Sequence, residues 1–289
     1  FEHMVSGLLC FGFGFTGKEL ARQQPDWKIW GTSRSQPETV NALPNVKNLL
    51  FDGINPLVDF DAIAENITHV LLSIPPGGEG DPVCNSMGER LASLPNLKWV
   101  GYLSTTGVYG DLQGGIATED TPCNPSGMRG QRRVDAENQW RALEQRYALP
   151  LHIFRLPGIY GPGRNQMVSL QNGKAHRIVK PGHVFSRIHV TDLARIIAAS
   201  MNASNPGRIY NIADDMVAPP QDVVTYAAEL LGVVPPPLQD IETADLSPMA
   251  RSFYADNKQV SNARIKEELG ILLSFPTYKI GLKALSESL

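Results

Sequence analysis

Three glycines near the start of the chain have the spacing of a phosphate-binding turn. Gly12, Gly14 and Gly17 form the pattern GxGxxG. The first glycine permits a tight turn, the second lets backbone amides approach a pyrophosphate, and the third lets a helix pack close to a strand. The helix then points its positive N-terminal end at the phosphates. The motif predicts dinucleotide binding, with a purely structural glycine turn as the alternative. The residues expected to contact the dinucleotide here are Gly12, Phe13, Gly14, Phe15, Thr16 and Gly17.

The segments around this turn alternate between apolar runs and helix-like stretches. Apolar runs linked by short turns predict strands that are buried on both faces, hence a parallel sheet covered on both sides by helices. After residue 162 the segments become short and predict a small lobe, including a strand pair around 178–184. The predicted strands are 5–11, 27–34, 49–52, 69–74, 99–104, 151–156 and 209–212, and the predicted helices are 18–24, 61–65, 83–94, 129–147, 191–201 and 221–231.

Composition excludes several classes of protein. The chain has 289 residues, of which 42% are hydrophobic and 19% charged, as in an ordinary globular protein with a sizeable core. A net charge of −3 provides no basic footprint for nucleic acid, and no apolar run is long enough to span a membrane. The three cysteines are scattered and lack metal-ligand spacing, which predicts a reducing, cytoplasmic location and no metal. Residues 1–3 are expected to be an expression remnant before a natural start at Met4.

The end of the second predicted strand bears on cofactor choice. An acidic residue about 20 positions beyond the glycines usually bonds the ribose of NAD, but this chain has Ser33, Arg34 and Ser35 there. A guanidinium suits a 2′-phosphate, so NADP is preferred and NAD is the alternative, unless Arg34 is simply a solvated surface residue. Asp52 either bonds the adenine amino group or caps the next helix. Further cofactor contacts are expected at Ser73, Ile74, Pro75, Leu103, Ser104, Pro157, Gly158 and Ile159.

Four later segments, taken with the glycine motif, carry a family resemblance. The segments are LSTTGVYGD (103–111), RLPGIYGPGRN (155–165), FSRIHVTDLA (185–194) and IYNIADD (209–215). The chain resembles an extended short-chain dehydrogenase/reductase of the NAD-dependent epimerase/dehydratase-like superfamily. The resemblance implies an α/β Rossmann fold, a doubly wound parallel sheet of about seven strands with a small C-terminal substrate lobe. We expect residues 4–162, with 185–213 returning to them, to form the dinucleotide-binding domain, and residues 163–184 and 214–289 to form the lobe.

The same resemblance identifies catalytic positions and a departure from the family pattern. The family's catalytic Ser/Thr position is Thr105, four residues before Tyr109. Anchoring on Gly130 and Glu137 places Arg129 at the position of the family's catalytic tyrosine and Arg133 at that of its lysine. Arginine titrates above about 12 and cannot exchange a proton near neutral pH. Ordinary alcohol–ketone chemistry should therefore be weak or absent, as in atypical superfamily members that lack the tyrosine.

Several residues are candidates to replace that tyrosine or to bind substrate. Tyr109 is either a proton donor or a packed tyrosine in its turn. Arg129 and Arg133 either hold an anionic substrate group together or belong to an exposed basic helix face that includes Arg132. His189 is either an acid–base group or a structural histidine. Arg164 and Arg187 resemble the family's substrate-phosphate contacts, or pair with acids in this slightly acidic chain.

Two functions fit these observations. The first is an NADP-dependent oxidoreductase or epimerase/dehydratase-like enzyme that acts on a small, anionic or phosphorylated substrate with unconventional acid–base groups. The second is a dinucleotide-sensing module that kept the fold and lost the chemistry. The resemblance further implies a homodimer formed through the helices at 83–94 and 129–147, and we expect neither nucleic acid nor a membrane as partner.

Overall fold

A computed structural model describes residues 5–36 and 42–289 of the chain. The expected remnant at 1–3 and the expected start at Met4 lie outside the described residues. The chain divides into two compact units. Unit 1 comprises described residues up to 105 together with 131–155 and 193–210, and unit 2 comprises 106–130, 156–192 and 211–289.

Unit 1 contains a parallel seven-stranded sheet with the order β11-β7-β5-β4-β1-β2-β3, which confirms the predicted Rossmann fold. Leu8 of β1 pairs with Ile29 of β2 on one side and with His69 of β4 on the other. Strand order reverses between β1 and β4, and such a switch point is where open α/β sheets bind ligands. The strands are β1 (Leu8–Phe11), β2 (Ile29–Ser33), β3 (Val46–Leu50), β4 (His69–Leu72), β5 (Trp99–Thr105), β7 (Leu151–Leu156) and β11 (Ile209–Asn211).

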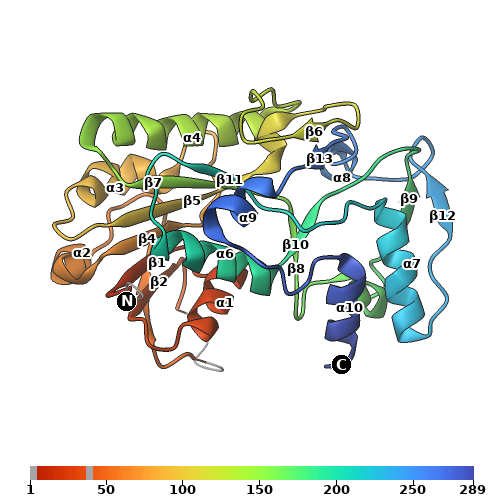
Figure 1. Cartoon of the computed structure of the whole chain (residues 1–289), viewed down its shortest axis with the longest axis horizontal. Coiled ribbons are helices and arrows are strands. Elements are labelled where there is room, and N and C mark those ends of the chain that lie inside the picture. The colour runs from red at the N-terminus through yellow and green to blue at the C-terminus, as the bar shows by residue number, and fades with distance from the viewer. Residues whose placement is uncertain (1–4, 37–41) are drawn as a thin grey trace. The chain divides into compact units, whose positions relative to one another are not determined.

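Helices cover both faces of this sheet (Figure 1). On one face, Met87 and Leu91 of α3 and Trp140 of α4 pack with sheet residues such as Val70 and Tyr102 in one core cluster. The strands can be apolar on both sides because water reaches neither face. The helices are α1 (Phe15–Gln23), α2 (Phe60–Ile63) with the 3₁₀ turn η1 (Ala64–Asn66), α3 (Pro82–Ala92), α4 (Met128–Tyr147) and α6 (Val190–Asn202).

Unit 2 is built from short elements around a smaller core that includes Met167, Val223 and Leu282. Its three strand pairs, β8 with β10, β9 with β12 and β6 with β13, are all parallel. The elements are η2 (Thr106–Tyr109), β6 (Ile116–Ala117), β8 (Gly158–Tyr160), α5 (Gln166–Gln171), β9 (Arg177–Val179), β10 (Arg187–His189), α7 (Pro220–Leu231), β12 (Leu238–Asp240), α8 (Pro248–Ser252), β13 (Gln259–Val260), α9 (Ala263–Leu269) and α10 (Tyr278–Ser286).

One prediction of local organisation differs from the structure. The expected strand pair around 178–184 is wrong, because β9 ends at Val179 and pairs with the distant β12. The compact units divide the chain differently from the predicted domains, which stay a prediction: 106–130, 156–162, 185–192 and 211–213 fall in unit 2. Strand pairing accounts for the first of these segments, because β6 joins β13 near the end of the chain.

Candidate functional site

A cavity of about 930 Å³ lies in unit 1 where the chain leaves β1, β2, β3 and β4. This is the edge of the sheet at which the strand order reverses, so the cavity lies where parallel α/β sheets bind ligands. Of the predicted cofactor residues, the cavity contains Gly12, Phe13, Gly14, Ser33, Arg34, Asp52, Ser73, Ile74 and Pro75. The full lining is residues 12–14, 32–34, 51–54, 73–80, 82, 85 and 86.

The glycine turn has the backbone geometry that the motif predicts. Gly12 has a φ of +83°, and its amide donates a 2.9 Å hydrogen bond to Thr32 Oγ1. Gly14 is the N-cap residue of α1 and makes no side-chain cap bond. A Cβ placed on Gly14 would meet nothing within 4 Å, whereas one on Gly17 would lie 3.1 Å from Cys10 Sγ. The turn therefore leaves α1 uncapped and open above Gly14, while Gly17 allows α1 to lie close to β1.

Of the predicted cofactor contacts beside the glycines, Phe13 lines the cavity, whereas Phe15 and Thr16 do not. The ring of Phe13 packs over Gly31, where an added Cβ would lie 2.5 Å from Phe13 Cγ. Phe15 and Thr16 belong to the first turn of α1, and Thr16 is buried. Neither Phe15 nor Thr16 lines the cavity as described. Their predicted contact with the cofactor remains a prediction.

The segment after β2 supplies a cation to the cavity wall. Arg34 is exposed and lines the cavity together with Ser33. The hydroxyl of Ser33 donates a 2.6 Å hydrogen bond to the carbonyl oxygen of Ser35, which fixes the bend after the strand. Ser35 itself is not among the lining residues.

The Asp52 carboxylate stabilises the turn formed by the residues that follow it. Its Oδ1 accepts hydrogen bonds from the amides of Ile54 and Asn55, both at 2.8 Å, and Oδ2 accepts one from Asn55 Nδ2 at 2.8 Å. These bonds lower the pKa of the Asp52 carboxyl below its ordinary value. The helix-cap alternative is wrong, because α2 begins at Phe60 and has Asp59 as its N-cap residue. The predicted contact with adenine remains a prediction.

The carboxyl end of β5 is tied to α4 by buried polar bonds. Ser104 Oγ donates to Glu137 Oε2 at 2.6 Å, and Glu137 pairs with Arg155 at 2.7 Å, with both side chains 3% exposed. Arg133 Nη1 donates to the carbonyl oxygen of Leu103 at 3.0 Å and to the hydroxyl of Tyr102 at 3.1 Å. Burial raises the pKa of the Tyr102 phenol. Leu103, Ser104 and Arg133 therefore hold the strand end together, and none of the three lines the cavity as described.

The remaining predicted catalytic residues have separate surroundings. Thr105 is half-buried at the last position of β5. The guanidinium of Arg129, in unit 2, lies 5.5 Å from the centre of the exposed Phe253 ring. Tyr109 is fully buried, and its hydroxyl donates a 2.5 Å hydrogen bond to Asn211 Oδ1. Burial of this kind is typical of a packed tyrosine. Its role as a proton donor remains a prediction from sequence.

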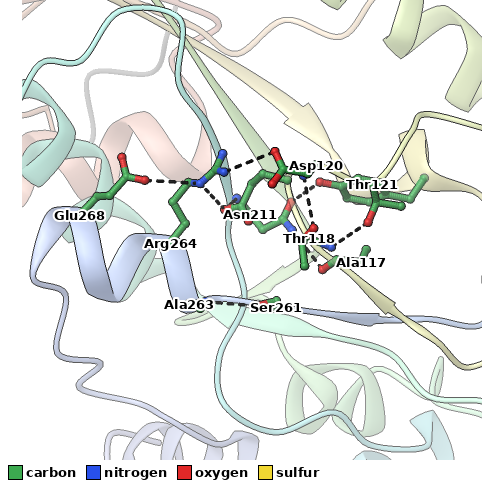
Figure 2. A network of polar contacts seen from close by, with 11 residues as sticks. Ala117, Thr118, Asp120, Thr121, Asn211, Ser261, Ala263, Arg264 and Glu268 are labelled. Carbon is green, nitrogen blue, oxygen red and sulfur yellow. Dashed lines mark hydrogen bonds and ion pairs between the residues drawn. The ribbon is translucent and has the colours of Figure 1, made fainter.

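The bond to Asn211 belongs to a polar network within unit 2 (Figure 2). The backbone N–H of Asn211 donates a 3.1 Å hydrogen bond to Glu119 Oε2, and Arg264 Nε lies 3.9 Å from that oxygen. Arg264 also pairs with Asp120 at 3.6 Å and with Glu268 at 3.4 Å. Burial raises the pKa of the Glu119 carboxyl, partly offset by the amide and Arg264. The network thus fastens the segment after η2 to α9.

The predicted substrate residues all lie in unit 2. His189 is buried; its Nδ1 accepts a 3.0 Å bond from the Thr191 amide, and its ring stacks on Phe275 with centroids 4.0 Å apart. Arg187 lies over the ring of Tyr278 at 5.4 Å, and burial lowers the pKa of its guanidinium. Arg164 is exposed in the turn that bridges back to Gly161. Pro157, Gly158 and Ile159 also lie in unit 2, the last two within β8.

Sequence reasoning missed part of the cavity. Residues 76–80 form a glycine-rich hairpin in which Gly77 and Gly80 exchange two backbone bonds of 3.0 and 3.2 Å. Gly53, Ile54, Asn85 and Ser86 were also missed. The available signal was the run Pro75-Pro76-Gly77-Gly78, which indicated a strand end but did not indicate that the loop turns back over the cavity.

The described residues contain neither a cluster of metal ligands nor a membrane-spanning helix. No group of three or more His, Cys, Asp or Glu side chains in this part of the chain is arranged to hold a metal ion. In the same residues, no helix is long and apolar enough to cross a membrane.

Comparison with known proteins identifies a family for one segment of the chain. Residues 90–213 match the model of the NAD dependent epimerase/dehydratase family. This segment carries a domain of that family. A functionally unknown conserved protein from Silicibacter pomeroyi DSS has a solved structure that is 48% identical over 98% of this chain and 99% of its own, with a TM-score of 0.88.

Two dTDP-glucose 4,6-dehydratases are among the more distant matches. The one from Streptomyces griseus is 26% identical over 178 residues, which are 58% of this chain. The match spans 52% of that relative, about half its length. The one from Bacillus anthracis str. Ames, solved in complex with NAD, is 19% identical over 97% of this chain and 95% of its own, with a TM-score of 0.81. That likeness is one of fold. NAD dependence is part of the family's description.

Proposed function

We propose that this chain is an NADP-preferring oxidoreductase or epimerase/dehydratase-like enzyme that binds its dinucleotide in the unit 1 cavity. The observation that carries the proposal is the open turn at Gly14, at the uncapped N-terminus of α1 and within a cavity of about 930 Å³ at the switch point. Backbone amides and the helix dipole favour a pyrophosphate there. The residues present fit the cofactor, because no described atom lies within 4 Å of a Cβ placed on Gly14.

The preference for NADP is proposed from Arg34. Its exposed guanidinium lines the cavity at the end of β2, where NAD-binding members of such folds place an acid. A guanidinium makes paired bonds to the negatively charged oxygens of a phosphate, whereas a ribose hydroxyl offers a single neutral acceptor. NAD remains the alternative cofactor, in keeping with the family description.

The proposed chemistry is limited by the residues at the strand end. A bound nicotinamide would accept or supply a hydride. Thr105, at the end of β5, is the hydroxyl we propose to orient the reacting oxygen of the substrate. Arg133, bonded to Leu103 and Tyr102, keeps that strand end in place and contributes positive charge. Because arginine cannot shuttle a proton, we expect rates about 10²–10⁴-fold below those of an enzyme with a positioned acid–base group.

The proposed substrate is a small anionic molecule, a sugar nucleotide before other classes. Support comes from the names of the two similar dehydratases, whose substrate dTDP-glucose carries a diphosphate. We also propose the predicted domains, a homodimer formed through α3 and α4, and a cytoplasmic location; the free thiols of Cys10, Cys84 and Cys123 agree with a reducing compartment. Light scattering at several concentrations tests the dimer.

A second candidate, a dinucleotide-sensing module without catalysis, is favoured by Arg129 at the position of the family's tyrosine and by the complete burial of Tyr109. One experiment separates the two functions. NADP(H) and NAD(H) are titrated by calorimetry, and turnover is then followed by NAD(P)H absorbance with UDP- and dTDP-sugars and simple carbonyls. Binding with turnover supports the enzyme, and binding without turnover supports the module. Failure to bind either dinucleotide rejects both.

A further inference from the structure

The three arginines of the segment RGQRR have different surroundings. Arg133 is bonded to Leu103 and Tyr102, and Arg129 lies over Phe253. Arg132 instead lies beside the hairpin that lines the cavity: a Cβ on Gly78 would be 3.5 Å from Arg132 Nη2 and 4.0 Å from its Cζ. Within the described part of the chain, no hydrogen bond or ion pair engages the Arg132 guanidinium.

The position of Arg132 on α4 explains this placement. Arg133, Glu137 and Trp140 follow the helical repeat and face the sheet. Arg132 and Gln139 are seven residues apart, two turns of the same helix, so they share the neighbouring face. Gln139 Oε1 accepts a 2.8 Å bond from the Asp81 amide, so this second face lies against the segment that follows the hairpin.

The hairpin is held firmly in front of Arg132. Gln139 Nε2 donates to Asn85 Oδ1 at 2.9 Å, and Asn85 Nδ2 donates to the Glu79 carbonyl oxygen at 2.8 Å. Gly80 has a φ of +98°, and an added Cβ there would lie 2.8 Å from Gln139 Oε1, so this position requires glycine. Gly77 and Gly78 line the cavity without a side chain, and the guanidinium lies beside Gly78 without itself lining the cavity. The Glu79 side chain is exposed at the same hairpin.

We propose that Arg132 binds a phosphate group of a ligand in this cavity, across the Gly77–Gly78 hairpin. The inference rests on the proposed function, which places a diphosphate-containing ligand in the cavity. A half-buried guanidinium beside a glycine-only loop offers two parallel N–H donors that suit a phosphate, and the loop lets the anion approach closely. The phosphate belongs either to the dinucleotide or to a nucleotide substrate.

The test compares Arg132→Ala and Arg132→Gln with Arg146→Ala, which removes a charge from the exposed last turn of the same helix. Calorimetry measures ADP and adenosine, and then UDP and uridine with NADP⁺ saturating. We expect both Arg132 variants to weaken at least one diphosphate by about tenfold or more, the size of one charge-assisted bond. The affinities of the Arg132 variants for adenosine and uridine should equal those of the wild type. The Arg146→Ala variant should bind all four ligands with wild-type affinity. Circular dichroism confirms folding, and the glutamine keeps the side-chain stem.

The outcomes separate the two sources and the two proposals. Weaker ADP binding assigns the phosphate to the dinucleotide, and a loss confined to UDP assigns it to the substrate. Equal effects of the Arg132 and Arg146 variants, or equal losses for nucleoside and diphosphate, overturn the inference, as does wild-type protein that binds neither diphosphate. Wild-type protein that binds UDP through Arg132 but binds no dinucleotide would reject the proposed function and leave this inference standing.

Discussion

Ser104 donates a 2.6 Å hydrogen bond to Glu137, so the strand that ends at Thr105 is fastened to α4 one residue before its last position. Glu137 also pairs with Arg155 of β7 at 2.7 Å. The carboxylate thereby connects two neighbouring strands and the helix that covers them. Glu137, which matches the glutamate of the family pattern, therefore connects the sheet to the helix.

Removing the Glu137 carboxylate should lower the free energy of unfolding much more than removing an exposed carboxylate. Glu137→Gln leaves the Arg155 guanidinium buried without its counter-charge, which typically costs about 3–5 kcal/mol. Asp135→Asn on the exposed side of α4 is the control and should cost under ~0.5 kcal/mol. Urea denaturation measures both. The double variant Glu137→Leu with Arg155→Met should recover most of the loss, and failure to do so would show that the Ser104 bond dominates.

Alanine substitutions at Gly14 and Gly17 should have different effects, the first on dinucleotide affinity and the second on the stability of the fold. Gly14→Ala places a methyl group in open space, so the melting temperature should stay nearly unchanged while dinucleotide affinity falls by about tenfold or more. Gly17→Ala places a methyl group 3.0 Å from Phe13 and 3.1 Å from Cys10. This crowding costs about 1–3 kcal/mol, against a gain of ~1 kcal/mol in helix propensity. Thermal melts and NADPH titration measure both effects.

The opposite pattern would contradict the assignment of the turn. Gly14→Ala with unchanged affinity would mean that no phosphate approaches the α1 N-terminus. A Gly17→Ala variant that is more stable than the wild type by the ~1 kcal/mol of helix propensity would mean that α1 can move away from β1 at no cost.

Arg34 should distinguish the two cofactors. Arg34→Ala should weaken NADP(H) by about 1–3 kcal/mol and leave NAD(H) nearly unchanged, because only NADP(H) carries the 2′-phosphate. Arg22→Ala, which removes an exposed charge paired with Glu19 in the same unit, is the control. Equal weakening of both cofactors would show that Arg34 does not contact the 2′-phosphate.

The sheet was predictable because its signal is local and strong. Leu8, Leu9 and Cys10 of β1, and Val70 and Leu71 of β4, are buried on both faces, so their apolar runs stand out in the sequence. The pairing of β9 with β12 was not predictable, because Leu238–Asp240 is exposed and lies some sixty residues away. Nothing in so short a polar segment specifies a distant partner.

The candidate site was predictable only in part, for a similar reason. The positions of Gly12 and Gly14 follow from a motif whose residues adjoin one another. The relation of Arg132 to Gly78 depends instead on how α4 is rotated against the sheet and on a hairpin 54 residues earlier. The helical periodicity across RGQRR indicates which arginines share a face of α4. It does not indicate which face meets the hairpin at residues 76–80.

Asp214 should make stability depend on pH. Burial raises the pKa of its carboxyl from 3.8 to about 7, with Asp192 and Asp215 adding to the rise and Arg187 opposing it. Oδ1 accepts a 3.0 Å bond from the Met216 amide, and Oδ2 has no hydrogen-bond partner among the residues that the structure describes. Between about pH 4 and 7 the folded state therefore binds the proton that the unfolded state has released. Its stabilising contribution is complete below pH 4 and is lost as the pH rises through 7.

Asp214→Asn removes this dependence, because the amide stays neutral at every pH. The variant should match the wild type near pH 4 and exceed its unfolding free energy at pH 8 by an amount on the order of 4 kcal/mol. His69 and His152, whose burial lowers each pKa to about 4, give the opposite slope below pH 6.5 in both proteins and cancel in the difference. Urea denaturation at pH 4, 6 and 8 measures it. A variant that is less stable by the same amount at pH 6 and pH 8 would mean that Asp214 is ionised and stabilised by Arg187 across this range.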